Sequence, residues 1–182
     1  MDMQEFNRRF QQQMQEIQEF VKGDDIKDIM GVESVNHFQS SFDNEGFTDE
    51  KLDKWDDVAR RDPNSVWYGH NGFPTEKPKK KIKKGNTELV GKFSQARATA
   101  KILRGETSEL RNSIFYKHTE SGVRVTSPTD YGRVHQFGLQ SKIYGKGVFT
   151  QKKRPFMGKS KVLKASIENK IKRELIKILK KK

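Results

Sequence analysis

The sequence predicts an α+β fold in which a small antiparallel sheet is packed by a long C-terminal helix and accompanied by N-terminal helices. Two observations lead to this prediction. Apolar residues recur at helical spacing near both ends of the chain, over residues 2–22 and 159–181. Between them, two short runs of strand-forming residues flank Glu120-Ser-Gly122, a sequence typical of a hairpin.

Residues 1–45 form a predicted N-terminal helical segment. One face of its first helix carries Phe6, Phe10, Ile17 and Val21, and Gly23 is a suitable stop. We expect a second helix that is interrupted near Gly31 and resumes over residues 33–42. Asn44-Glu-Gly46 then predicts a turn.

Residues 46–101 form a predicted irregular, basic middle segment. Residues 48–55 fit a capped helical turn with Thr48 as the cap. Residues 76–85 are rich in Lys and Pro, which predicts a mobile loop. The candidates for contact with nucleic acid or an acidic partner are Lys77, Lys79, Lys80, Lys81, Lys83 and Lys84. A solvated loop is the simpler interpretation, because the tract lacks aromatic residues that would stack on bases.

Residues 102–182 form a predicted α+β core with a C-terminal amphipathic helix. Its predicted elements are, in order, a short helix over 107–113, strands over 114–117 and 123–126, and a short helix over 131–137. Residues 142–151 fit either a second hairpin or an ordered loop. The terminal helix has one apolar stripe, made of Leu163, Ile167, Ile171, Leu175, Ile178 and Leu179.

Charge is abundant and unevenly distributed along the chain. The 182 residues carry a net charge of +13, with 34% charged and 32% hydrophobic residues. Residues 1–62 hold 8 Lys/Arg and 16 Asp/Glu, a net charge of −8, whereas residues 63–182 hold 29 and 8, a net charge of +21. We therefore expect a small core that neighbouring copies help to complete. We also expect acidic and basic faces suited to contact between copies or with nucleic acid.

The residue types and spacings favour no enzymatic chemistry. The absence of Cys excludes disulfides, thiolate metal sites and a Cys nucleophile. The four His residues lack metal-ligand spacing, and no phosphate-binding or dinucleotide-binding loop occurs. Adjacent carboxylates such as Asp56 and Asp57 point in different directions on a helix. We expect no catalysis, no cofactor and no metal. No apolar run approaches the roughly 20 residues of a membrane span, so we also expect no membrane contact.

The most specific feature is a block from Leu110 to Gly158. It contains Tyr131-Gly-Arg-Val-His-Gln-Phe-Gly138 and Arg154-Pro-Phe-Met-Gly158. We interpret it as a fixed structural corner between sheet and helix, in which Gly and Pro restrict the backbone path and aromatic residues anchor it. The residues assigned to this structural motif are Leu110, Tyr131, His135, Gln136, Phe137, Gly138, Arg154, Pro155, Phe156 and Gly158.

With these segments in this order, the chain resembles the phage virion morphogenesis family, also called tail completion proteins, and is similar in layout to head–tail joining proteins. The resemblance is closest over residues 102–179. Two positions differ from it: the family usually carries Gly where this chain has Glu109, and often Ala where this chain has Gly132.

The resemblance implies a structural virion protein that completes the tail or joins it to the head. Several copies would form a ring around the DNA channel, next to other neck, tail terminator, tail tube or connector proteins, with non-specific contact to DNA in the channel. It implies a location in the virion, and in the host cytoplasm during assembly. The alternative left open is a basic, sequence-independent nucleic-acid-binding protein of a mobile element that uses the Lys tract.

Overall fold

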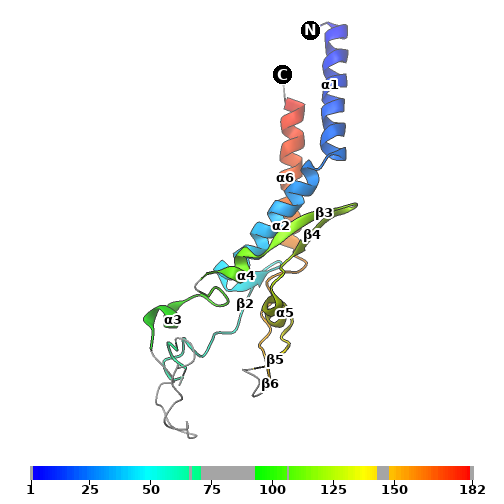
Figure 1. Cartoon of the computed structure of the whole chain (residues 1–182). Helices are drawn as coiled ribbons and strands as arrows, with labels where there is room; N and C mark the ends of the chain where they lie inside the picture. The colour runs from blue at the N-terminus through cyan, green and yellow to red at the C-terminus, as the bar shows by residue number, and fades with distance from the viewer. Residues whose placement is uncertain (1, 66, 71–92, 106, 143–147, 181–182) are drawn as a thin grey trace.

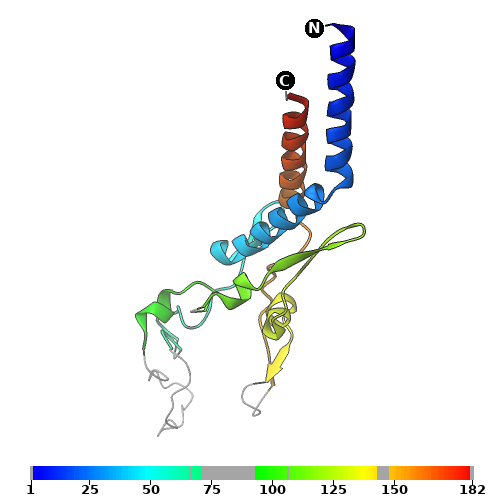
Figure 2. The ribbon, with the colours of Figure 1, turned by 45° about the horizontal axis from the view of Figure 1, so that its top comes forward.

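The molecule is elongated, with two antiparallel helices side by side at one end and short hairpins and helices at the other (Figures 1 and 2). This computed structural model describes residues 2–65, 67–70, 93–105, 107–142 and 148–180. Helix α1 (Met3–Lys22) and helix α6 (Lys161–Lys180) lie side by side, and helix α2 (Asp25–Asn44) leads from them into the body. No helix among the described residues is long and apolar enough to cross a bilayer.

Within the described residues, the strands form three separate two-stranded antiparallel sheets rather than one sheet. The pairs are β1 (Gly46–Thr48) with β2 (Leu52–Lys54), β3 (Phe115–Thr119) with β4 (Gly122–Thr126), and β5 (Gln140–Lys142) with β6 (Val148–Thr150). Helix α2 lies centrally, because it packs against β3 and β4 as well as against α6. The predicted α+β class, with N-terminal helices and a long C-terminal helix, is confirmed.

The described part of the chain also has three short helices: α3 (Gln95–Thr99), α4 (Glu109–Asn112) and α5 (Asp130–Phe137). Helix α4 confirms the helix predicted over residues 107–113, and α5 confirms the one over residues 131–137. The hairpin β3–β4 confirms the turn predicted at Glu120-Ser-Gly122. Strands β5 and β6 pair as the second hairpin that was one of two alternatives. The predicted mobile loop over residues 76–85 lies largely outside the described residues.

The predicted break at Gly31 is wrong, since α2 runs without interruption from Asp25 to Asn44. Gly31 is buried, and a Cβ atom there would come within 2.2 Å of the Tyr116 ring. Gly31 therefore allows β3 to approach the helix closely and does not end it. The helix ends within the predicted turn Asn44-Glu-Gly46, where Glu45 has a left-handed φ of 53°.

The predicted helical turn over residues 48–55 is wrong, because this segment is the hairpin β1–β2. Contacts distant in sequence account for the difference. The Trp55 side chain is buried in the core, and its Nε1 donates a hydrogen bond to the Pro155 carbonyl at 2.8 Å. Asp49, in the hairpin turn, accepts hydrogen bonds at the start of α6. These contacts require an extended chain here and override the local helical preference.

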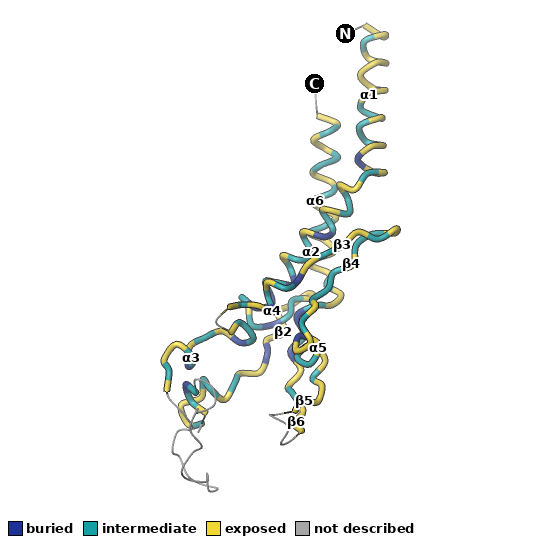
Figure 3. Tube along the Cα trace, viewed as in Figure 1, coloured by how far each residue is buried: buried dark blue, intermediate teal, exposed yellow. Residues whose placement is uncertain are grey.

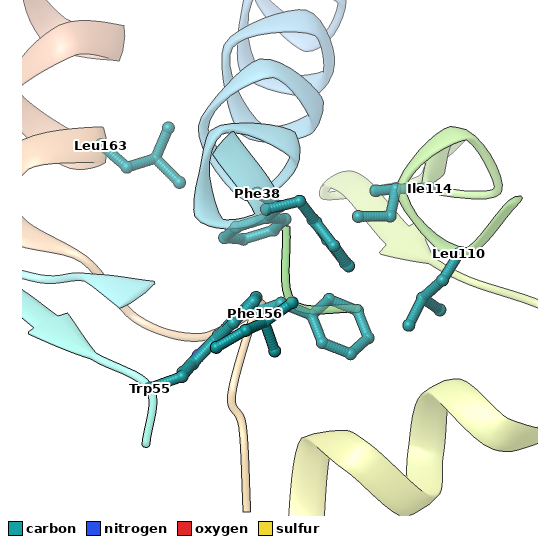
Figure 4. Close-up of a cluster of buried hydrophobic side chains, with 8 residues drawn as sticks. Phe38, Trp55, Leu110, Ile114, Phe156 and Leu163 are labelled. Carbon is teal, nitrogen blue, oxygen red and sulfur yellow. The ribbon is translucent and has the colours of Figure 1, made fainter. Parts of the chain in front are cut away.

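The core lies where α2 meets the segment that leads into α6 (Figure 4). Its buried members are Phe38, Phe42, Trp55, Ile102, Leu110, Ile114, Phe156 and Leu163. The Phe42 ring lies 5.7 Å from the Trp55 ring and 5.1 Å from the Phe156 ring, measured between centroids. Much of the remaining chain, including most of α1, is exposed or half-buried (Figure 3), as expected for a sequence this lean in apolar residues.

Candidate assembly surface

A single carboxamide fixes the corner between α5 and the segment before α6. The Oε1 atom of Gln136 accepts hydrogen bonds from the backbone N–H of Phe156 at 2.9 Å and of Met157 at 3.2 Å. Its Nε2 donates to the Met157 carbonyl at 2.6 Å. The backbone of this segment thus pairs with a side chain as it would with a neighbouring strand, which holds α5 and the segment at a fixed spacing.

Around this link, His135 and Arg154 make a second connection. The Arg154 backbone N–H donates to the His135 carbonyl at 2.8 Å, and Nη2 of Arg154 donates to the Asp56 carbonyl at 3.1 Å. Burial lowers the pKa of both side chains, and the nearby Arg154 charge further lowers the pKa of His135. The His135 ring is therefore favoured in its neutral form, with Nδ1 3.1 Å from Nε2 of Gln151.

Pro155 and Phe156 anchor the corner to the core. The Phe156 side chain is buried against Phe42, and the Phe156 carbonyl accepts a hydrogen bond from Oγ of Ser41 at 3.3 Å. The Pro155 carbonyl accepts from Trp55. Because both carbonyls have partners on distant segments, this stretch of chain is held from α2 and from the hairpin β1–β2 at once.

Glycines allow two close approaches in the corner. Gly138 ends α5 in the left-handed region, with a φ of 67°, and a Cβ atom there would lie 3.1 Å from the Gln151 carbonyl oxygen. At Gly132 a Cβ atom would come within 2.8 Å of Cδ1 of Leu110 and within 2.7 Å of Oγ1 of Thr129. Gly158 is less confined, since its Cβ would meet Phe47 at 3.4 Å.

Glu109 and Gly132, the two positions at which the chain differs from the family it resembles, lie beside each other in space. Burial raises the pKa of Tyr131, and so does its hydrogen bond with the Glu109 side chain. Gly132 follows Tyr131 and packs on Leu110, which follows Glu109. Glu109 therefore supplies a contact that Gly could not make. An Ala at position 132 would require Leu110 or Thr129 to shift.

The corner leaves an open apolar groove of about 530 Å³ between α2, β4, α5 and the segment before α6. Its walls come from Phe38 and Val125 on one side and from Phe137, Phe156 and Met157 on the other. Phe137 is 61% exposed, which is unusual for a large aromatic side chain next to a core. Phe137, one of the aromatic residues of the structural motif, thus borders this groove.

Tyr131 points to a different side of α5 and lines a basic pocket of about 290 Å³. The pocket is formed by Arg60, Arg97, Lys101 and Arg104, with His135 and Leu110 at its walls. The Arg60 guanidinium donates hydrogen bonds to the backbone carbonyls of Arg97, Ala100 and Lys101 at the end of α3. Burial, and then the neighbouring charges of Arg61 and Arg97, lower the pKa of Arg60. The lining holds four basic side chains and the carboxylate of Glu109, so positive charge is in excess here.

Sequence reasoning missed this pocket, because its basic residues are scattered over the middle segment and only the adjacent Arg60 and Arg61 gave a signal. The predicted candidates for anion contact were instead the Lys residues of the Lys/Pro tract. Those residues lie outside the described part of the chain: Lys77, Lys79, Lys80, Lys81, Lys83 and Lys84.

An acidic groove of about 600 Å³ lies toward the other end of the molecule, between α1, α2 and α6. Its carboxylates come from Glu16, Glu19, Asp25, Asp28 and Glu174. Hydrogen bonds from His118 at 2.8 Å and Tyr116 at 3.0 Å lower the pKa of Asp28 and keep it charged. Among the described residues, no group of His, Asp and Glu side chains could hold a metal ion.

The corner lies within the part of the chain that has known relatives. A model of the phage virion morphogenesis family matches residues 78–176. The chain belongs to this family. It therefore has a structural or assembly role in the phage virion. The match includes α3, α4, α5, the hairpin β3–β4 and most of α6, together with every residue assigned to the structural motif.

Outside this match, comparison adds no relative. No curated protein and no solved structure matches the chain. Helices α1 and α2 and the hairpin β1–β2 precede the matched residues, although Phe42 and Trp55 supply core contacts to Phe156 within them. The family segment and the N-terminal segment therefore share one core.

Proposed function

We propose that this phage assembly protein completes the tail or joins it to the head, as several copies arranged in a ring around the path of the DNA. Family membership supplies the assembly role. The observation that best supports the finer proposal is the open apolar groove, because the motif residues Gln136, Phe137, Phe156 and Gly158 line it and Phe137 stands exposed on its border.

The groove suits an apolar side chain of a neighbouring subunit or tail protein. The hydrogen bonds of Gln136 fix one wall of the groove, so little conformational entropy is lost when a partner binds. The exposed Phe137 ring would add a large contact area at its edge, which is typical of residues that dominate binding energy.

Charge supports contact between copies through two different surfaces. The acidic groove of α1, α2 and α6 and the basic pocket near α3 lie toward opposite ends of the elongated molecule (Figure 1). When two different patches meet, the contact is head-to-tail, and it closes into a ring if the rotation between copies allows. Opposite charges would also guide the copies into register.

The test is a Phe137→Asp variant in a phage whose infectivity depends on this gene. Because Phe137 is already exposed, we expect the chain to fold, infectious particles to fall by at least about tenfold, and unjoined heads and tails to appear by electron microscopy. Phe115→Asp is the control, since Phe115 is also partly exposed but lies outside the groove. Normal infectivity of Phe137→Asp, or equal loss in both variants, would contradict the proposal.

The basic pocket favours one second candidate, a sequence-independent nucleic-acid-binding protein. Lys and Arg neutralise phosphates without reading bases, so the pocket and the Lys tract at residues 77–84 would contact DNA of any sequence. DNA binding by the isolated chain fits both candidates. Detection of the chain in purified particles, by mass spectrometry, distinguishes them, since only a virion component remains there.

A further inference from the structure

The N-terminal part of α1 extends past the end of its neighbour α6. Nε2 of Gln13 donates a hydrogen bond to the Leu179 carbonyl in the last turn of α6 at 3.2 Å, which places Gln13 level with that turn. Residues 3–12 therefore project beyond α6, by about 15 Å at 1.5 Å per residue. Figures 1 and 2 show the N-terminal end standing clear of the C-terminal end in both views. We call residues 3–12 the overhang.

The overhang continues the face that α1 uses for packing inside the molecule. Gln13 contacts α6 and Phe20 lines the groove between α1, α2 and α6, and Phe6 and Phe10 precede them at the same helical spacing. Phe20 is buried, whereas Phe6 and Phe10 are each 52% exposed and stack on each other with centroids 6.3 Å apart. Two large aromatic side chains thus lie on a packing face with nothing packed over them among the described residues.

We infer that the overhang binds a second copy of this chain, with the two overhangs packed antiparallel around a two-fold axis. At this end of the described chain the two helices form a step: the overhang of α1 is its wall, and the last described turn of α6 is its floor. Under a two-fold rotation, the overhang of each copy fills the space above the other copy's α6. The same surface then serves both partners, as an isologous contact requires, and the Phe6 and Phe10 faces meet.

Charge at the step favours this occupant and this direction. In the antiparallel pair, α1 of one copy starts where α6 of the other ends, and both helices run the same way. The start of α1 carries Asp2 and Glu5, of which Glu5 also pairs with Arg9. The last turn of α6 carries Lys177, which also pairs with Glu174, and Lys180. Opposite charges would then meet across the junction, and the two helix dipoles would lie in series. A parallel pair would instead bring like helix ends together.

The contact uses a surface separate from the groove of the proposed function, so each proposal can fail while the other stands. The tip contact is a property of the purified chain, whereas the groove is tested in the particle. If both hold, a ring whose members also pair through their tips would face a second ring across two-fold axes.

The first experiment measures the association of the full chain by sedimentation equilibrium. We expect a dimer, and in Phe10→Glu a dissociation constant raised by about tenfold or more, because a charge replaces an apolar ring at the contact. Gln12→Glu is the control, since it adds the same charge on the opposite, exposed face of α1. A monomeric native chain, or equal effects of the two variants, would overturn the inference.

The second experiment tests the direction of pairing and does not depend on Phe10. The chain has no Cys, so Met3→Cys and Lys180→Cys each introduce a single thiol. Mixed and treated with a short bis-maleimide linker, they should give the mixed dimer joined between positions 3 and 180. Dimers formed mainly by Met3→Cys with itself would indicate parallel pairing. That result, or the absence of any cross-linked dimer, would overturn the inference.

Discussion

The Gln136 side chain connects α5 to the segment before α6 through one carboxamide that has three backbone partners. No apolar residue of similar size can satisfy the Phe156 N–H, the Met157 N–H and the Met157 carbonyl. A typical hydrogen bond contributes only about 1 kcal/mol net, but a half-buried backbone group left without a partner costs about 1–3 kcal/mol. At the scale of single residues, the corner therefore depends more on hydrogen bonds to its backbone groups than on the apolar surface that it buries.

Replacement of Gln136 by Leu should lower the free energy of unfolding by about 2–4 kcal/mol, because several backbone groups lose their partners together. Urea denaturation followed by circular dichroism measures this change. Gln140→Leu is the matched control on the exposed strand β5, and we expect it to change stability by less than about 0.5 kcal/mol. Equal stability of the two variants would show that Gln136 does not hold the corner.

Local sequence signals also explain which residues of the corner could be predicted. Gly138 and Pro155 were assigned to it because their backbone preferences are visible in the sequence alone. The hydrogen bonds that Gln136 both accepts from and donates to the backbone were not predicted, since they depend on the distance between α5 and Phe156. Arg60 and Arg97 were missed for the same reason, because only the folded chain brings α3 next to Arg60.

Among the elements, those with strong local periodicity were predicted well. Helix α6 has a continuous apolar stripe, and the hairpin β3–β4 has a turn sequence between two strand-forming runs. The hairpin β1–β2 was predicted as helix, since its strands are short and are held by contacts with Pro155 and with the start of α6. Gly31 was predicted to interrupt α2, because the Tyr116 ring that packs on it is distant in sequence.

The hairpin turn has a further role in capping α6. The Oδ1 atom of Asp49 accepts a hydrogen bond from the Lys161 N–H at 2.8 Å, and the Asp49 carbonyl accepts from the Val162 N–H at 3.2 Å. Free N–H groups at a helix start are normally capped by a residue just before the helix. In α6, Ser160 supplies such a cap, since its Oγ accepts from the Leu163 N–H at 3.1 Å, and the distant turn adds partners for the N–H groups of Lys161 and Val162. The hairpin β1–β2 and α6 should therefore stabilise each other.

Asp49→Ala should therefore lower the free energy of unfolding by about 1 kcal/mol, the usual cost of losing a capping side chain. The effect should be local, with faster amide hydrogen exchange in the first turn of α6. Asp53→Ala provides the comparison, because Asp53 is an exposed carboxylate on β2 of the same hairpin. Unchanged exchange at Lys161 and Val162 in Asp49→Ala would exclude the capping role.

Across the whole molecule, the uneven charge of the sequence gives charged sites of both signs. Residues 1–62 carry a net charge of −8 and residues 63–182 a net charge of +21, and the folded chain gathers part of this charge into an acidic groove and a basic pocket. The uneven distribution could be predicted from the sequence, but the two sites could not, since each combines residues from distant segments. Two sites of opposite charge suit head-to-tail contact between copies, as proposed above.

This arrangement predicts rescue by a double charge reversal. Glu19→Lys in the acidic groove and Arg97→Glu in the basic pocket should each weaken assembly, because each places like charges opposite one another in the contact between copies. The double variant restores opposite charges and should recover much of the lost infectivity in a complementation assay. The single defects should also weaken as salt rises, since salt screens the repulsion.

Glu168→Lys is the control for added charge, because Glu168 is an exposed carboxylate of α6 outside the acidic groove. We expect it to assemble as the native chain does and to be unable to rescue Arg97→Glu. A double variant no better than the worse single variant would mean that the two sites do not meet. In that case the basic pocket would have an anionic partner other than the acidic groove of a neighbouring copy, and DNA phosphate would be the first to test.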